Sequence, residues 1–205
     1  MFANMYLSEV ASIAQNFDCD SIENCITILA NVRRNRGRLF ILGIGGSAGT
    51  ASHAVNDFRK IAGIESYAPT DNVAELTART NDDGWHTVFV NWLKTSNLRD
   101  TDAVLVISVG GGDLSKNISA NLVYAIDYAR EAKAKVLAIV GYKGGYASLK
   151  SDCCITIPVG SINRVTPHTE EFHSVILHLI VTHPLLKLHE TTWEKLNHGS
   201  TRLPK

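Results

Sequence analysis

The sequence predicts an α/β fold in which helices cover both faces of a parallel sheet. Apolar runs of strand length alternate with longer segments whose apolar residues recur at helical spacing. The strand-like runs are apolar throughout, as in Ala103–Ser108 (AVLVIS), which is typical of parallel strands buried on both faces. The two strongest runs each lead into a glycine-rich loop. Ligands of such sheets bind beyond the carboxyl ends of the strands, so these loops mark the predicted site.

The N-terminal part of the chain predicts two helices over about residues 5–34. Leu7, Val10 and Ile13 recur at helical spacing, and a second apolar series begins at Ile22. The step Cys19-Asp20-Ser21 separates the two series and suggests a helix start at Asp20 or Ser21. We expect one domain over residues 1–205, with residues 1–36 as a helical extension.

The rest of the chain predicts five strands and the helices between them. Strands are expected at residues 39–42, 65–68 (weaker), 103–108, 135–140 and 154–158. Helices are expected at residues 48–62, 71–79, 85–95 and 114–132, with a short helical turn at 147–150. A long last helix is expected over residues 169–189, with a kink at Pro184.

Composition and charge restrict the expected partners to small molecules and proteins. Lys and Arg number 20, as do Asp and Glu, so no excess of one sign recruits nucleic acid or a membrane surface. The apolar runs are too short to span a membrane, and residues 1–12 lack the pattern of a signal peptide. We therefore expect a cytoplasmic protein, whose four cysteines, none in a CxxC pair, are buried free thiols.

The two glycine loops have a composition suited to an anionic or hydroxylated ligand. They are Gly43-Ile44-Gly45-Gly46-Ser47-Ala48 and Ser108-Val109-Gly110-Gly111-Gly112-Asp113-Leu114-Ser115. Glycine lets backbone amides approach an anion, and the positive end of the next helix adds to the attraction. A tight turn would explain one such loop, whereas two at equivalent strand ends favour a ligand. The glycine spacing misses the dinucleotide fingerprint by one residue and a Walker lysine is absent, so no nucleotide cofactor is expected.

Histidines and an aspartate in the predicted helices are candidates for chemistry. His53 and Asp57 are four residues apart and share one helix face, which suits a metal, an oriented imidazole or a purely structural pair. Near the C-terminus a histidine recurs every five residues from His168 to His183, a step that forms no single stripe on a helix. We expect His168, His183 and His189 to be ordinary surface or core residues.

Four motifs in this order resemble the sugar isomerase (SIS) domain, and within it the sedoheptulose-7-phosphate (phosphoheptose) isomerases. The motifs are GIGGSAGTASH, LTARTNDDGW, ISVGGG and TEEFHSVILH. The resemblance implies a Rossmann-like three-layer domain with a five-stranded parallel sheet, and a homotetramer (or homodimer) with active sites between subunits. It also implies isomerisation of sedoheptulose 7-phosphate to D-glycero-D-manno-heptose 7-phosphate through an enediol or enediolate.

The resemblance also assigns roles to residues. It implies Asp57 and His178 as the acid–base pair, and His53, Asp57, Glu170 and His178 as ligands of a zinc ion that some members bind. Substrate and phosphate binding is implied for Gly45, Gly46, Ser47, Asn81, Asp82, Ser108, Gly110, Gly111, Ser115 and Glu170.

The chain departs from the family pattern in ways that affect the substrate more than the fold. The phosphate loop S-T-S-G-N-S of the family is replaced by residues 108–115. Ser115 is expected to supply the last hydroxyl of that loop, helped by Lys116. Asp113 is expected to cap the helix. Asp57 replaces a glutamate and Ile44 an asparagine. These changes leave two alternatives, a non-catalytic module that binds a phosphosugar or a protein, and an isomerase of another sugar phosphate.

Glu170 stands where the family has a glutamine, which favours a metal because a carboxylate binds a divalent cation better. Eight residues of helix separate it from His178, so both reach one metal only if the helix starts late, as Pro167 suggests. In the alternative, Glu171 orients His178.

Overall fold

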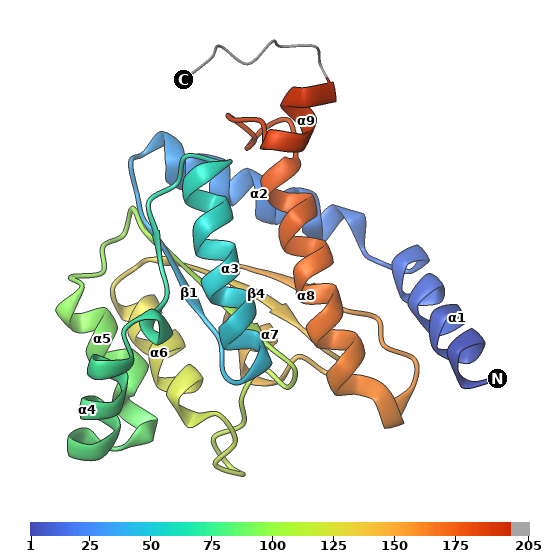
Figure 1. Cartoon of the computed structure of the whole chain (residues 1–205). Coiled ribbons are helices and arrows are strands. Elements are labelled where there is room, and N and C mark those ends of the chain that lie inside the picture. The colour runs from blue at the N-terminus through green and yellow to red at the C-terminus, as the bar shows by residue number, and fades with distance from the viewer. Residues whose placement is uncertain (198–205) are drawn as a thin grey trace.

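The computed structural model describes residues 1–197 and contains a five-stranded parallel sheet with the order β2-β1-β3-β4-β5 (Figure 1). The predicted α/β class is confirmed. The strands are β1 (Leu39–Leu42), β2 (Ser66–Tyr67), β3 (Ala103–Ser108), β4 (Lys135–Val140) and β5 (Cys153–Thr156). All four neighbouring pairs are parallel, and β3 pairs along its whole length with β4. The predicted domain includes residues 198–205, which lie outside the described residues.

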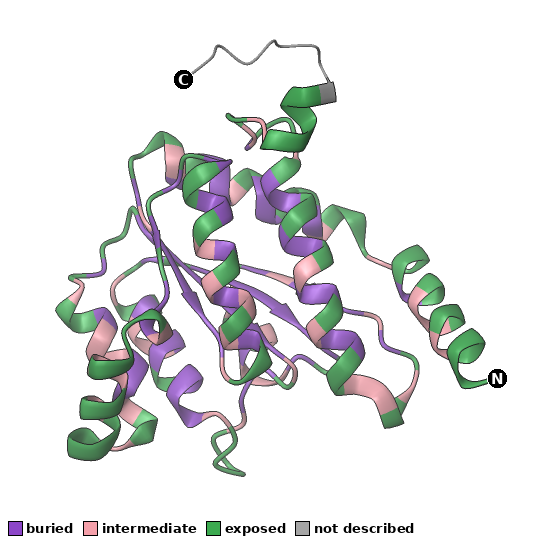
Figure 2. Ribbon diagram, viewed as in Figure 1, coloured by how far each residue is buried: buried purple, intermediate pink, exposed green. Residues whose placement is uncertain are grey.

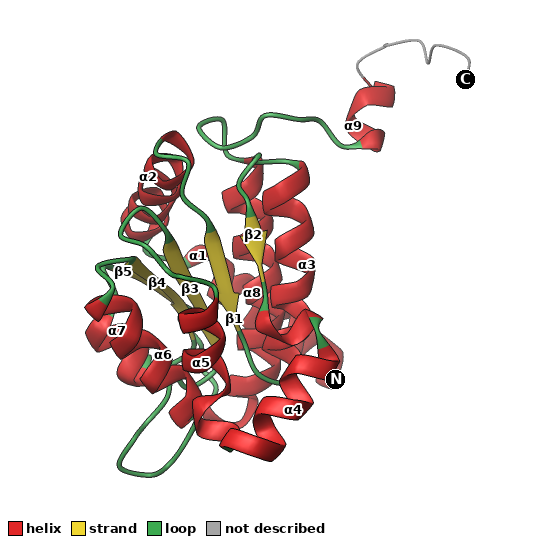
Figure 3. Cartoon of the chain, turned by 90° about the vertical axis from the view of Figure 1, so that its left-hand side faces the viewer, coloured by secondary structure: helices red, strands yellow, loops and turns green. Residues whose placement is uncertain are grey.

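Helices cover both faces of the sheet. They are α1 (Phe2–Gln15), α2 (Cys19–Arg34), α3 (Gly46–Lys60), α4 (Val73–Asp83), α5 (Val88–Thr95), α6 (Ala120–Glu131), α7 (Gly145–Lys150), α8 (Val165–Thr182) and α9 (Thr192–Asn197). Helices α3 and α8 lie on one side of the strands, and α6 and α7 on the other (Figure 3). Short 3₁₀ turns occur at Pro69–Asp71, Trp85–Thr87 and Ile162–Arg164.

Each face of the sheet has its own hydrophobic core. Along β3, Leu105 and Ile107 join the core beneath α2, α3 and α8, whereas Val104 and Val106 join the core beneath α5 and α6. All six residues of β3 are buried, as the purple strands of Figure 2 show. This explains the uninterrupted apolar runs, because successive side chains of a strand point to opposite faces and both faces are covered.

The start of α6 and the end of α8 differ most from the prediction. Helix α6 begins at Ala120 and not at residue 114, because Asp113 and Ile118 pair with each other through two backbone hydrogen bonds of 2.8 and 2.9 Å. Helix α8 runs from Val165 to Thr182, so the prediction of a kinked helix to His189 is wrong. The residue before a proline is restricted to extended backbone, and His183 has φ −61° and ψ 137° before Pro184.

The two N-terminal helices are attached to the body of the protein in different ways. Helix α2 packs against β5 and contributes to the core that α3 and α8 also cover. It begins at Cys19, where the Asp18 side chain caps it, and not at the predicted Asp20 or Ser21. Helix α1 is largely exposed, and Ile13 is its one buried residue. Within the described residues, no helix has the length and apolar character that crossing a membrane requires.

Candidate active site

The strand order places the two glycine loops next to each other. From β1 the chain crosses to one edge of the sheet, and from β3 it proceeds toward the other edge, so the order reverses between β1 and β3. In open α/β sheets the crevice outside the carboxyl ends at such a reversal is the usual binding site. The loops that follow β1 and β3 both begin at this crevice.

The first glycine loop forms a sharp strand-to-helix turn that leaves backbone open to solvent. Gly45 occupies the N-cap of α3 with φ +62°, a conformation that favours glycine. A Cβ on Gly43 would lie 2.4 Å from the carbonyl oxygen of Ser47, so the turn itself excludes a side chain there. Gly45 and Gly46 are exposed and Ser47 is buried. The first two of these predicted binding residues are therefore accessible at the start of α3.

Helices α3 and α8 pack side by side and bring three of the predicted functional side chains together (Figure 1). The Nε2 atoms of His53 and His178 are 3.0 Å apart. One carboxylate oxygen of Asp57, Oδ2, lies 3.2 Å from the His53 Nε2 and 3.4 Å from the His178 Nε2. Its other oxygen accepts a hydrogen bond of 2.9 Å from the Asn56 side-chain amide. The Asp57 side chain is 12% exposed, whereas both imidazoles are more than half exposed.

This group has a donor set and a geometry that fit a single metal ion. Its three ligand atoms lie within 4.8 Å of one another. For ligand bonds of about 2.0–2.1 Å, a tetrahedral site has ligand–ligand distances of about 3.3–3.4 Å. The observed 3.0, 3.2 and 3.4 Å are close to those edges. Two imidazoles and one carboxylate are also the protein ligands of many catalytic zinc sites, which keep a fourth position open.

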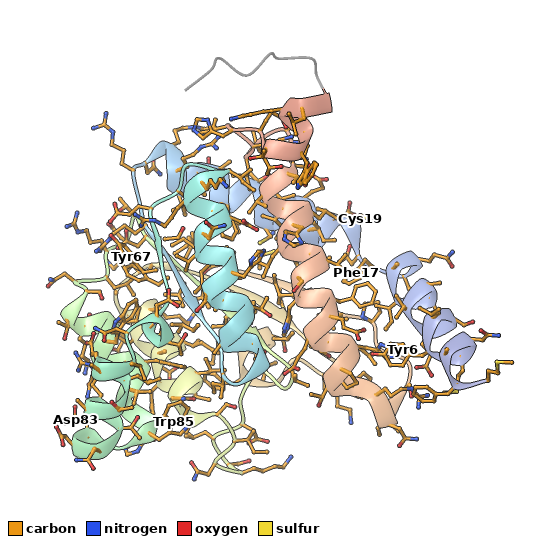
Figure 4. The ribbon with its side chains drawn as sticks, viewed as in Figure 1. Tyr6, Phe17, Cys19, Tyr67, Asp83 and Trp85 are labelled. Atoms are coloured by element: carbon orange, nitrogen blue, oxygen red, sulfur yellow. The ribbon has the colours of Figure 1, made fainter. Side chains whose placement is uncertain are left out.

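Glu170, the fourth predicted ligand, lies at another point of the same helix pair. Helix α8 starts at Val165 and not later, so Glu170 belongs to its second turn. The Glu170 carboxylate lies beside the exposed Gly46, where an added Cβ would lie 2.6 Å from both carboxylate oxygens. The neighbouring Glu171 accepts a hydrogen bond of 2.5 Å from the Tyr6 hydroxyl and is thereby directed toward α1, as the position of Tyr6 in Figure 4 indicates.

The second glycine loop packs against the loop that follows β4. Gly111 has φ +70°, and a Cβ there would lie 1.8 Å from the carbonyl oxygen of Gly144. Its own carbonyl accepts a hydrogen bond of 2.9 Å from the Ala147 amide, and its amide donates to the Ser108 hydroxyl oxygen at 3.1 Å. Gly110 is exposed and has open space around it. Packing between backbones therefore accounts for Gly111, whereas Gly110 remains open at the crevice.

The hydroxyl predicted for phosphate binding, that of Ser115, is engaged elsewhere. It donates a hydrogen bond of 2.6 Å to Asp113, which also forms an ion pair of 3.2 Å with Lys116. These contacts lower the pKa of the Asp113 carboxyl below its ordinary value. Asp113 thus closes the tight turn before α6 rather than capping a helix. Ser115 and Lys116 are exposed in this turn and do not begin the helix.

Two residues that the sequence reasoning missed occupy the start of α6. Ser119 is its N-cap residue, with φ +49°, and makes no side-chain capping bond. Asn121 is fully buried in the first turn, and its side-chain nitrogen has no hydrogen-bond partner within the described residues. The sequence offered no clear signal for this start, because Leu114 and Ile118 continue the apolar pattern although α6 begins only at Ala120, after its N-cap Ser119.

Asn81 and Asp82 lie on a different part of the surface. They belong to α4, where the Asn81 amide donates to the Asp82 carboxylate at 2.8 Å, and both are exposed. Helix α4 lies on the opposite side of α3 from α8 in Figure 1, and the neighbouring Asp83 and Trp85 mark this end in Figure 4. Within one chain these two residues are therefore separate from the His53, Asp57 and His178 group.

Two further histidines of α8 are buried. His173 is fully buried beside the ends of β3 and β4, and burial lowers its pKa to about 4, outweighing the opposite effect of the Ile139 and Ser108 backbone. Neither of its ring nitrogens reaches a partner at hydrogen-bond geometry within residues 1–197. His168 is also buried, and its Nε2 lies 2.8 Å from a carboxylate oxygen of Glu9 on α1.

Comparisons with known proteins identify the family. The model of the SIS domain matches residues 5–141. The phosphoheptose isomerase of Chlorobaculum parvum is 30% identical over 185 residues, which cover 86% of this chain and 83% of that protein. The lincomycin biosynthesis protein LmbN of Streptomyces lincolnensis is 29% identical over 184 residues, covering 86% of this chain and 66% of that protein.

The fold of solved relatives agrees with these sequence matches. The structure of a phosphoheptose isomerase from Neisseria gonorrhoeae superimposes with a TM-score of 0.74 at 22% identity, covering 87% of this chain and 95% of that one. The resemblance derived from the four motifs is thus confirmed, including the kinship with isomerases. The chain belongs to the SIS domain family.

Proposed function

We propose that the protein is an aldose–ketose isomerase of a phosphosugar, with sedoheptulose 7-phosphate as substrate and D-glycero-D-manno-heptose 7-phosphate as product. The observation that supports it most is the approach of Asp57 and His178, whose Oδ2 and Nε2 atoms from two helices lie 3.4 Å apart. The similarity to phosphoheptose isomerases supports the substrate class. The second candidate is an isomerase of a different sugar phosphate. The similarity to LmbN, a lincomycin biosynthesis protein, supports it.

The reaction requires two proton transfers, and the two side chains suit them. A base must take a proton from C1 of the ketose and return it to C2, while a second group moves a proton between the two oxygens. Asp57, the less exposed of the pair, is proposed as the base that acts on carbon. His178 is proposed as the group that acts on the oxygens, because an imidazole both accepts and donates near neutral pH.

We also propose that His53, Asp57 and His178 can hold zinc, in which case the metal would act on the sugar oxygens in place of the His178 Nε2, which is then a ligand. The fit of their three ligand atoms to tetrahedral edges supports this assignment. A bound zinc ion would polarise the sugar carbonyl and stabilise the enediolate. The Asn56 amide, which holds the second oxygen of Asp57, would keep the carboxylate oriented in either case.

The phosphate is proposed to bind at the start of α6 rather than at α3. The positive end of α6 and the Ser119 hydroxyl follow the loop after β3, and the buried side-chain nitrogen of Asn121 behind them has no hydrogen-bond partner within residues 1–197. At the start of α3 the Glu170 carboxylate lies beside Gly46 and would repel another anion. Glu170 is instead suited to accept hydrogen bonds from sugar hydroxyls.

A second copy of the chain is proposed to complete the site, in a homotetramer or homodimer. The imidazoles of His53 and His178 are 55% and 54% exposed, which leaves the reacting groups open to water in a single chain. On α8 the apolar side chains of Val175 and Leu179 are also exposed beside them. Burying such a patch between subunits would exclude water from the enediolate.

An NMR time course with sedoheptulose 7-phosphate in D₂O tests the proposal. The expected product is the aldose with one deuterium at C2, formed by the native enzyme but not by Asp57→Asn. The exposed substitution Asp20→Asn serves as the matched control and should keep full activity. Turnover of other ketose phosphates alone would favour the second candidate. Thermal stabilisation by a sugar phosphate without turnover would show a binding module and overturn the proposal.

Metal and oligomer are tested separately on protein purified without a His-tag. Elemental analysis should show one zinc per chain, and His53→Ala should lose it. A zinc content near zero together with unchanged activity in a chelator would overturn the metal assignment. Light scattering after size exclusion should give a mass of two or four chains, whereas a monomer with full activity would overturn the shared site.

A further inference from the structure

Two cysteines belong to the core where α2 packs on β5, away from the candidate active site. Cys25 lies on the buried face of α2 and is 1% exposed, and Cys153 is the first residue of β5 and is 7% exposed. The Cys153 sulfur lies 3.2 Å from the carbonyl oxygen of Ser21, one helical turn before Cys25. Residues four apart share a helix face, so the Cys153 side chain is directed at the part of α2 that carries Cys25.

The surroundings give the two thiols different acidities. The neighbouring Cys25 and Asn24 side chains lower the pKa of the Cys153 thiol, against the opposite effects of its burial and of the Asp18 and Asp152 charges. The interaction with Cys153, together with burial, raises the pKa of Cys25 well above its ordinary value. Cys153 is therefore the more acidic of the two thiols. This is the arrangement of an attacking and a resolving thiol.

We propose that Cys25 and Cys153 are a modification site at which a hydroperoxide forms an intramolecular disulfide. In the first step the Cys153 thiolate attacks one oxygen of hydrogen peroxide, the O–O bond breaks, and the hydroxide released takes up a proton as water. In the second step the Cys25 sulfur attacks the sulfenic sulfur, the S–O bond breaks, and a second water leaves with the Cys25 proton. Two thiols are oxidised and one peroxide is reduced to two waters.

The disulfide would join α2 to the edge strand of the sheet. The two cysteines are far apart in the sequence, so the cross-link removes much of the freedom of the unfolded chain. A rise in Tm of roughly 5–10 °C is expected, reversed by a dithiol reductant. The other two cysteines are not placed to compete. Cys19 is exposed at the start of α2, and Cys154 points to the opposite face of the sheet, toward the other core.

Peptide mapping of the native chain after hydrogen peroxide treatment tests the site directly and needs no variant. The expected result is the loss of two hydrogen masses from the intact protein and a peptide pair linked through Cys25 and Cys153. The double variant Cys19→Ser/Cys154→Ser should react in the same way and show the same Tm rise. Cys25→Ser should instead gain oxygen at Cys153, and Cys153→Ser should leave Cys25 unoxidised.

Three outcomes would overturn the proposal. They are oxygen added to Cys153 of the native chain without a cross-link, a disulfide through Cys19 or Cys154, and no reaction of the folded chain under conditions that oxidise the unfolded one. None of these outcomes depends on isomerase activity, so the test is independent of the proposed function.

Discussion

Buried His173 should make the stability of the protein fall between about pH 6.5 and pH 4. In the folded chain its pKa is lowered to about 4 from an ordinary value of 6.5, because burial disfavours the imidazolium. In this interval the unfolded chain binds a proton at this residue and the folded chain does not. Acid therefore stabilises the unfolded state, and the free energy of unfolding decreases as the pH falls.

The size of this effect follows from the two pKa values. The difference between pKa values of 6.5 and about 4 corresponds to a loss of about 3 kcal/mol in the free energy of unfolding. This loss is absent above pH 6.5 and complete below pH 4. The Glu9 carboxyl acts in another interval, since hydrogen bonds from Arg164 and His168 lower its pKa to about 2. Its stabilising contribution is present above pH 4.5 and is lost only as the pH falls toward 2. The two groups are therefore separable.

Urea denaturation followed by circular dichroism at pH 7, 6, 5 and 4.5 measures the effect. The matched variant His173→Leu keeps a similar volume and removes the titrating ring, whose nitrogens have no partner at hydrogen-bond geometry within residues 1–197. The native chain should lose about 2 kcal/mol more than the variant between pH 7 and pH 5. Equal losses in the two proteins would show that the His173 ring takes up its proton without unfolding, and would refute the reasoning.

Three further substitutions test the site and its loops. Asp57→Asn should reduce isomerase turnover by at least about 100-fold without changing the Tm by more than a few degrees, and unchanged turnover would exclude Asp57 as the base. Glu170→Gln should leave the zinc content of untagged protein unchanged, in contrast to His53→Ala, because its carboxylate lies beside Gly46 rather than in the ligand group. Gly111→Ala should lower the free energy of unfolding by more than about 2 kcal/mol, because the Cβ meets the Gly144 carbonyl. Gly110→Ala is its control, because a Cβ at Gly110 would enter open space. Similar losses of free energy of unfolding in both variants would contradict the explanation by contact with the Gly144 carbonyl.

The strands were predictable because a strand that is buried on both faces is apolar throughout, and such a run is visible in the sequence. β1, β3 and β4 have the predicted boundaries, and each is a short apolar run between polar segments. The segment before α6 shows how an apolar pattern can mislead. Leu114 and Ile118 extend the apolar pattern of the helix, yet both are exposed in a turn that Asp113 closes through its own hydrogen bonds. Apolar periodicity does not distinguish an exposed turn from the first turn of a helix.

The candidate site was predictable as far as it depends on local spacing. His53 and Asp57 share a face of α3 because they are four residues apart, and any helix would place them so. His178 was assigned to this site only from the resemblance to the SIS family, because the packing of α3 on α8 is what brings it close to His53 and Asp57. The position of Glu170 depends on where α8 begins, and Pro167 gave the wrong indication because a proline is tolerated anywhere in the first turn.

Asp57 reaches both imidazoles although its side chain is one methylene shorter than the glutamate that the resemblance implies at this position. The buried face of α3 carries small residues, Ala51 and Ala54, in the same core as Phe172 and Ile176 of α8. Small side chains at a helix contact allow the helix axes to lie closer together. A carboxylate one methylene shorter than glutamate can then still place one oxygen 3.2 and 3.4 Å from the two imidazoles. Asp57 is therefore not evidence for a lost activity, because its carboxylate still reaches both imidazoles.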